Sequence, residues 1–178
     1  RNAVLENQTA EGMRAVMAPK MHGMAALEAI GAMPLAYFTA FSSTAALLGS
    51  PGQANYAAAN AMMDAASTAR HACGLSCLSL NLGAWAVGMA GEHHPTVASR
   101  LQASGVGIIY PAAGLEAVAK ATIATSSLAS TIVLSPFNWQ TLQIRAGGML
   151  SQVFQDFDVM PARADESMSE ARNASSVS

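Results

Sequence analysis

Three short runs of mainly apolar residues recur along this chain, and alanine-rich stretches of helical length separate them. The runs occupy residues 35–43, 75–85 and 130–139. Strands of a parallel sheet that helices cover on both faces are apolar throughout, whereas half-exposed strands alternate between apolar and polar residues. The order of these segments therefore predicts an α/β fold with a parallel sheet flanked by helices.

Helices are expected before and between these strands. Residues 2–33 have apolar side chains at helical spacing, and Pro19 predicts a break just after it. Residues 53–72 have the strongest helical pattern, which Gly74 ends. A further helix over 111–127 opens with proline, which the first turn of a helix tolerates.

The remaining segments have weaker patterns. Residues 86–110 are mixed in character and contain glycine, which favours a loop with a short helix, and such segments often cover sites. Residues 140–160 are weakly helical at best. From Pro161 the residues are small and polar, so we expect a linker or disordered tail over 146–178.

Composition argues against several classes of protein. Hydrophobic residues make up 52% of the chain, so most of it is expected to fold. The formal charge is −2 without a basic patch, which argues against nucleic acid as a partner. Glu28 interrupts the best apolar run, so we expect no membrane partner and a cytoplasmic location, unless a targeting signal lies upstream.

Neither the cysteines nor the histidines form a recognisable metal motif. Cys73 and Cys77 are four residues apart without companion ligands, which favours two reduced thiols. His93 and His94 are adjacent and lack a third ligand. We therefore predict no metal site.

Side chains with useful chemistry collect where the predicted strands end. In parallel sheets, ligands bind beyond the carboxyl ends of the strands. Ser42 and Ser43 end the first strand, and residues 81–85 end the second. Tyr56 and Asn60 open the helix between these strands, and their spacing places them on one face. A hydroxyl, a phenol and a carboxamide are thus expected in one crevice.

This set suits the reduction of a carbonyl group by a hydride that a cofactor supplies. The developing alkoxide needs a proton and hydrogen-bond donors. Tyr56 can give the proton, although the pKa of a free phenol is about 10. A nearby ammonium, for which Lys20 is the candidate, lowers that pKa by favouring the phenolate. Ser43 would hold the carbonyl oxygen, and Asn60 could position a water or the lysine.

Three segments in this order resemble the ketoreductase domain of modular polyketide synthases and of fatty-acid synthases, within the short-chain dehydrogenase/reductase superfamily. They are APKMHG (18–23), FTAFSSTAALLGSPGQANYAAANAMMDAASTARHACGL (38–75) and LNLGAWAVGMA (80–90). The most specific element is the pair Tyr56 and Asn60, with Ser43 thirteen residues before the tyrosine. Ordinary short-chain reductases have a lysine where Asn60 stands.

This resemblance implies a Rossmann-like sheet and the NADPH-dependent reduction of a β-ketoacyl thioester, carried by an acyl carrier protein, to the β-hydroxyacyl thioester. It implies that Tyr56 is the proton donor, that Ser43 orients the carbonyl, and that Lys20 and Asn60 support them. Ser42 is the alternative to Ser43 as that donor. The residues implied to lie at the cofactor are Ser42, Tyr56, Lys20, Leu82 and Gly83. Residues 86–110 would form a lid over the substrate groove, and the neighbouring synthase domains would be further partners.

The sequence also departs from the family pattern, because the glycine-rich phosphate-binding turn and the first strands are not in it. We therefore expect residues 1–145 to be the C-terminal portion of a catalytic domain cut at Arg1, with poor NADPH binding on its own. Two alternatives remain open. Asn60 and the tail argue against a short-chain reductase of a free small molecule. The retained serine, tyrosine, asparagine and lysine argue against a non-catalytic structural half-domain.

Overall fold

A sheet of three parallel strands, in the order β1-β2-β5, organises the chain. The strands are β1 (Thr39–Ser43), β2 (Leu78–Leu82) and β5 (Thr131–Leu134). The computed structural model describes residues 3–30, 35–87, 95–125 and 129–146. The predicted α/β class with a parallel sheet is confirmed. The strands are shorter than predicted: β1 is the last part of the run 35–43, β2 the middle of 75–85, and β5 the first part of 130–139.

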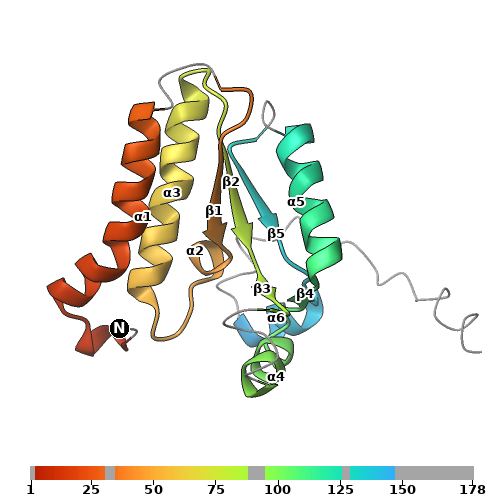
Figure 1. Ribbon diagram of the computed structural model, residues 1–178. Helices are drawn as coiled ribbons and strands as arrows, with labels where there is room; N and C mark the ends of the chain where they lie inside the picture. Colours follow the sequence, from red (N-terminus) through yellow and green to blue (C-terminus); the bar gives the residue numbers. More distant parts are fainter. Residues whose placement is uncertain (1–2, 31–34, 88–94, 126–128, 147–178) are drawn as a thin grey trace, which may run out of the picture.

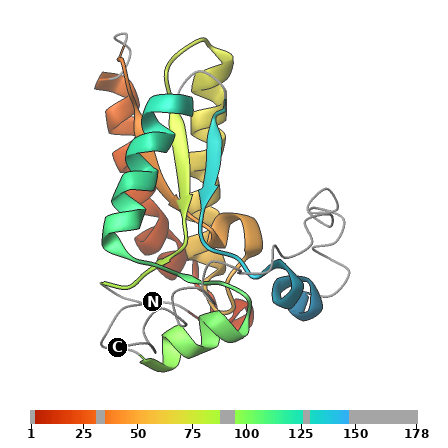
Figure 2. The ribbon, with the colours of Figure 1, turned by 90° about the vertical axis from the view of Figure 1, so that its right-hand side faces the viewer.

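Helices cover both faces of this sheet. α1 (Ala10–Ile30) and α3 (Ala54–Ala72) lie together on one side, and α5 (Pro111–Thr125) lies on the other (Figure 1). The view in Figure 2 places α5 in front of the sheet and α3 behind it. Each long helix separates two strands of the sheet in sequence or precedes the first, as the sequence pattern predicts.

The expected break at Pro19 does not occur, and this prediction was wrong. α1 runs without interruption through Pro19 from Ala10 to Ile30, and its ribbon bends along its course (Figure 1). Proline removes one backbone hydrogen bond and displaces the preceding turn, which a helix can absorb by kinking. The long contact of α1 with α3 keeps the two halves in one helix.

Several short elements were not predicted. α2 (Ala45–Leu48) follows β1 directly, and a second parallel sheet pairs β3 (Ala84–Trp85) with β4 (Ile108–Ile109). The single strand predicted over 75–85 is therefore two strands that belong to different sheets. Isolated pairs of residues carry too little periodicity to reveal a two-residue strand.

The remaining short elements surround the carboxyl end of the main sheet. α4 (Pro95–Ala103) lies in the segment predicted as a loop with a short helix, and α6 (Trp139–Ala146) follows β5. A single turn of 3-10 helix, η1 (Leu5–Asn7), precedes α1. In Figure 1 the three strands point toward α2, and β3, β4, α4 and α6 gather at that same end.

The core lies between the sheet and the helix pair α1–α3, and small side chains make close packing possible there. Met24, Phe38, Ala40 and Cys77 cluster there. Leu78 and Leu80 of β2 are fully buried on the opposite face, toward α5, because they alternate with Ser79 and Asn81, which contact α3. Ala59 is fully buried where α3 faces the sheet. Met24 and Met63 fill gaps in this layer, as flexible thioethers often do. Alanine-rich faces thus allow helix and sheet to approach closely.

Some predictions concern residues outside the described ranges. These are residues 147–178 of the tail predicted over 146–178, whose first residue, Ala146, ends α6, and the pair His93 and His94. Among the described residues, no group of three or more histidine, cysteine or acidic side chains gathers as a metal site would require. No helix within the described ranges is both long enough and apolar enough to span a membrane.

Candidate active site

The carboxyl ends of β1, β2 and β5 are held level with one another. Ser43 is opposite Leu82 in the β1–β2 register, and Leu82 is opposite Leu134 in the β2–β5 register. Two further backbone bonds extend this alignment beyond the strands, from Thr44 N to Leu82 O at 3.0 Å and from Gly83 N to Leu134 O at 2.9 Å. Side chains at these ends therefore share one edge of the sheet.

The start of α3 presents Tyr56 and Asn60 to this edge. The side-chain amide of Asn60 donates to the backbone carbonyl oxygen of Tyr56 at 2.8 Å, so the two residues are in direct contact. Asn60 is fully buried, and its Oδ1 has no hydrogen-bond partner among the described residues. Tyr56 is half-buried. A buried acceptor without a donor is uncommon in proteins and often marks the position of a water or ligand.

Ser42 and Ser43 have different environments, although they are neighbours in sequence. Ser42 is buried, and its hydroxyl donates to the backbone carbonyl oxygen of Asn60 at 3.3 Å. Ser43 is half-buried, and its hydroxyl oxygen accepts a bond from the backbone N–H of Ala45 at 3.2 Å. An oxygen that accepts one bond still has its own proton to donate. Within the described part of the chain, the hydroxyl proton of Ser42 is donated to Asn60, whereas that of Ser43 has no acceptor.

Lys20 reaches the same place from α1. Its Nζ donates to the backbone carbonyl oxygen of Phe41 at 3.4 Å and lies 5.8 Å from the centre of the Tyr56 ring. Burial lowers the pKa of Lys20 below its ordinary value, and the negative charge of Asp64 opposes this shift. The predicted proximity of Lys20 to Tyr56 is thus present in the structure.

A chain of contacts joins four of the predicted site residues. Lys20 lies beside Tyr56, Tyr56 is bonded to Asn60, and Asn60 is bonded to Ser42. Ser43 follows Ser42 at the end of β1. The roles of these residues in catalysis or cofactor binding remain predictions at this point.

Gly83 is required by packing, whatever its relation to a cofactor. A Cβ at this position would lie 2.7 Å from the Ser135 Cβ and closer still to the Ser135 hydroxyl oxygen. Real side-chain atoms do not approach so closely, so only glycine fits between β2 and the segment after β5. Leu82, the other residue expected near the nicotinamide, is half-buried at the end of β2.

Sequence reasoning missed a second polar group beneath the site. The Asp64 carboxylate of α3 accepts hydrogen bonds from Ser79 at 2.6 Å and from Asn81 at 3.0 Å, both in β2. The signal was available, because Asp64 follows Asn60 by four residues and two polar residues alternate in an otherwise apolar strand. No local sequence pattern, however, predicts that Asp64 of α3 lies beside Ser79 and Asn81 of β2.

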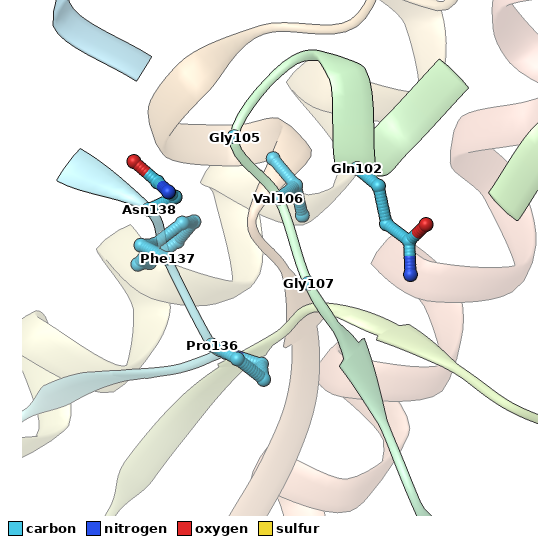
Figure 3. Close-up of a pocket in the computed structure, with 7 residues that line it drawn as sticks. All are labelled: Gln102, Gly105, Val106, Gly107, Pro136, Phe137 and Asn138. Carbon is cyan, nitrogen blue, oxygen red and sulfur yellow. The ribbon is translucent and has the colours of Figure 1, made fainter. Parts of the chain in front are cut away.

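A separate hollow of about 270 Å³ lies between the end of α4 and the segment after β5. It shares no residue with the predicted site, and its lining is mostly apolar. Figure 3 shows Asn138 and Gln102 at opposite sides of it. The residues that line it are Gln102, Gly105, Val106, Gly107, Pro136, Phe137 and Asn138.

This hollow owes its shape to close backbone contacts. Gly107 N donates to Pro136 O at 2.7 Å, and Asn138 N donates to Gly105 O at 2.8 Å. Apart from the carboxamides of Gln102 and Asn138, the hollow is lined by glycine and apolar residues, and none of these is an acid, a base or a nucleophile. The edge with Tyr56 is therefore the stronger candidate for the active site.

Comparisons with known proteins agree with this geometry. Residues 1–87 match the family described as the KR domain. Polyketide synthase GfsB of Streptomyces halstedii is 40% identical over 127 residues, which are 70% of this chain and 2% of that protein. The phthioceranic/hydroxyphthioceranic acid synthase of Mycobacterium tuberculosis (strain ATCC 25618 / H37Rv) is 43% identical over 117 residues, 64% of this chain and 6% of the synthase.

Solved structures extend the similarity beyond residue 87. An A1-type ketoreductase has a TM-score of 0.74 and 30% identity, over 82% of this chain and 30% of that chain. The first ketoreductase of the tylosin polyketide synthase has a TM-score of 0.69 and 27% identity, over 82% of this chain and 31% of that one. The chain therefore spans only a small part of the curated synthases and about a third of the solved ketoreductases.

The described part of the chain has the α/β fold, with a parallel sheet flanked by helices, that solved ketoreductases have. Residues 1–87 match the KR domain family, and the described part of the chain is similar to ketoreductases of polyketide synthases. The resemblance expected from the sequence is thus confirmed.

Proposed function

We propose that this chain contributes the catalytic residues for the NADPH-dependent reduction of a β-ketoacyl thioester to a β-hydroxyacyl thioester in a polyketide synthase. The observation that carries the proposal is the contact chain from Lys20 through Tyr56 to Asn60 at the carboxyl end of the sheet. The match to the ketoreductase family supports the same reaction.

Tyr56 is proposed as the proton donor to the developing alkoxide. A phenol is a good donor in this role when a cation stabilises the phenolate that it leaves behind. The Lys20 ammonium, 5.8 Å from the ring centre, is the cation placed to do so. Asn60 has a buried, unpartnered Oδ1 beside this pair, which suits an ordered water that would return a proton to Tyr56.

Ser43 is proposed to hold the substrate carbonyl oxygen. The Ser42 hydroxyl donates its proton to Asn60 O, whereas no described group accepts the proton of the Ser43 hydroxyl. A donor aimed at the substrate oxygen stabilises the negative charge that forms there. The Ser42 hydroxyl is engaged by Asn60 O, so Ser42 is assigned a supporting place beneath the cofactor.

The cofactor, when bound, supplies the hydride. The nearby residues proposed to hold its nicotinamide end are Ser42, Tyr56, Lys20, Leu82 and Gly83. They fit that group, because the lysine and the phenol offer hydrogen-bond donors to a ribose at the strand ends. The choice of NADPH over NADH in this proposal rests only on the resemblance to the family.

An acyl carrier protein that bears the β-ketoacyl chain is the proposed substrate partner. The multidomain synthases among the relatives support neighbouring synthase domains as further partners. Residues 86–110, with α4 and β4, are proposed as the lid over the substrate groove.

A substitution of Tyr56→Phe tests the proposal in the longest natural polypeptide that carries this sequence. The consumption of NADPH would be followed with a β-ketobutyryl thioester as substrate. General acid catalysis contributes about 10²- to 10⁴-fold, so the rate should fall by that factor. Tyr37→Phe is the matched control, because Tyr37 is 53% exposed and precedes the amino end of β1, away from the carboxyl ends that carry the site. Equal rates in both variants would refute the proposed role.

A further inference from the structure

The carboxylate of Asp64 connects α3 to the strand beneath it through two hydrogen bonds. Its Oδ1 accepts from the Ser79 hydroxyl at 2.6 Å, and its Oδ2 accepts from the Asn81 side-chain amide at 3.0 Å. The shorter bond lies within the range of about 2.5–2.7 Å that is typical of hydroxyl-to-carboxylate bonds. Both donors are buried in β2 and Asp64 is half-buried, so the two bonds are partly shielded from water.

Asp64 lies on the same helical face as Tyr56 and Asn60, because the three residues are spaced by four. One turn earlier, the backbone carbonyl of Asn60 accepts a bond from Ser42 in β1. α3 is therefore anchored to β1 at Asn60 and to β2 at Asp64. Bonds to two neighbouring strands restrain the rotation of α3 on the sheet, together with the packing of its buried side chains and the bond from Cys77 Sγ to Ser67 Oγ.

Packing alone gives no reason for this polar group. A partly buried carboxylate has a desolvation cost, and apolar side chains of similar volume often replace such groups without loss of stability. Asn81 also retains a buried Oδ1 without a partner. Polar groups of this kind can specify one arrangement of neighbouring elements. Here the arrangement in question is the position of Tyr56 beside Lys20 and the end of β1.

Asp64 also acts on Lys20 electrostatically. Burial lowers the pKa of Lys20, and the Asp64 charge is the named opposing influence. Lys20 faces Asp64 and Tyr56 from α1, and both belong to α3. The carboxylate that anchors the helix therefore also favours the charged form of the lysine beside the phenol.

We propose that Asp64 is a positioning residue for the reduction, whose carboxylate fixes the rotation of α3 on β2 and so holds Tyr56 in place for proton transfer. This inference rests on the function proposed above. It adds a residue that touches neither substrate nor cofactor and acts through Tyr56. A displacement of about 1 Å at a reacting group can reduce a rate by roughly 10²-fold, which is enough to make such an anchor measurable.

Two variants in the longest natural polypeptide separate this role from general stability. Asp64→Asn removes the charge at constant size, and the amide can accept only one of the two bonds at its oxygen. The double variant Asp64→Asn/Asn81→Asp restores an amide–carboxylate pair between the same positions, with its direction reversed. Glu116→Gln is the matched control, because this glutamate is 65% exposed and paired only with Lys120 in an i,i+4 bridge on α5.

The expected result is a fall in kcat of about tenfold to a hundredfold for Asp64→Asn, with KM for the thioester changed by less than about threefold. Because the amide–carboxylate pair is restored, the double variant should recover at least half of the decrease in log kcat that Asp64→Asn causes. Glu116→Gln should not differ from the parent protein. An unchanged kcat in Asp64→Asn, or no recovery in the double variant, would overturn the proposal.

Amide hydrogen exchange gives a readout that does not depend on activity. Exchange over residues 54–60 should accelerate in Asp64→Asn and return toward the parent rate in the double variant, while exchange in α5 stays constant. If the parent protein does not reduce the thioester, the proposed function fails, and the exchange data alone decide whether Asp64 anchors α3. Equal exchange in all three proteins would overturn the anchor itself.

Discussion

The side-chain amide of Asn60 donates a hydrogen bond to the backbone carbonyl oxygen of Tyr56, one turn earlier in α3, at 2.8 Å. This bond uses the donor side of the carboxamide within the helix and leaves its acceptor, Oδ1, buried and without a partner. An unsatisfied buried acceptor is destabilising by about 1–3 kcal/mol. We infer that Asn60 is present for function, at some cost to stability.

Asn60→Ala should therefore separate activity from stability. The change loses side-chain packing and one hydrogen bond, but it also removes the unpartnered oxygen, so the free energy of unfolding should change by less than about 1 kcal/mol. The rate of reduction should fall by at least about tenfold if an ordered water depends on this oxygen. Denaturant unfolding and steady-state rates on the same samples measure both quantities.

Asn55→Ala is the matched control for this pair of measurements. Asn55 is equally buried, and its Oδ1 accepts a bond from Tyr56 N at 2.8 Å. Its loss should reduce the free energy of unfolding by about 1–3 kcal/mol, since a satisfied bond is removed from the core. A larger loss of stability in Asn60→Ala than in Asn55→Ala would contradict our interpretation of the unpartnered oxygen.

The two serines at the end of β1 should respond in opposite ways to substitution. Ser43→Ala should reduce the rate by about 10²-fold, as expected for a lost oxyanion donor, with stability nearly unchanged. Ser42→Ala should reduce the free energy of unfolding by about 0.5–1.5 kcal/mol, because the bond to Asn60 O is lost, with a smaller effect on rate. The reverse pattern would assign the carbonyl-orienting role to Ser42.

Lys20 should make stability and activity depend on pH in opposite directions. Burial lowers its pKa below the ordinary value of 10.5, so the folded chain releases this proton at a lower pH than the unfolded chain does. Between the lowered pKa and 10.5 the unfolded state binds more protons, and stability rises with pH across that window. Below the lowered pKa both states hold the proton, so the cost of burying the ammonium is the same at every pH there.

The corresponding measurement compares the parent protein with Lys20→Met over alkaline pH. The stability of the parent relative to the variant should increase as pH rises through the window, while the parent's rate of reduction falls because the ammonium beside Tyr56 is lost. Lys120→Met is the control, because Lys120 is 74% exposed and should show neither trend. Parallel trends in stability and rate would contradict the proposed role of Lys20.

Gly83 should tolerate no side chain unless its neighbour is reduced in size. Gly83→Ala places a Cβ against the Ser135 side chain and should destabilise the fold by about 1–3 kcal/mol through overpacking. Gly83→Ala/Ser135→Gly should recover part of this loss, since the clashing atoms are removed. Thermal unfolding of the two variants measures the recovery.

Gly23→Ala provides the comparison for a glycine without neighbours. A Cβ at Gly23 would meet no atom within 4 Å, and the residue lies inside α1. Alanine is favoured over glycine in a helix interior by about 0.5–1 kcal/mol, so this variant should be more stable than the parent. A stabilised Gly83→Ala would show that the strand ends can separate more easily than their backbone bonds indicate.

The sequence by itself determined the order of helices and strands, the parallel class of the sheet and the shared face of Tyr56 and Asn60. These properties follow from local rules, because side-chain periodicity and the spacing of residues on a helix need no knowledge of the rest of the chain. The same rules failed at Pro19, where the contact of α1 with α3 outweighs the local preference for a break.

Only the tertiary structure decided which serine has a free proton, why position 83 must be glycine, and that Asp64 connects α3 to β2. Each of these depends on a contact between segments far apart in sequence, such as Ser42 with Asn60 or Gly83 with Ser135. Distance in space between such segments is set by packing of the whole sheet and its helices. No periodicity in the sequence encodes that distance directly.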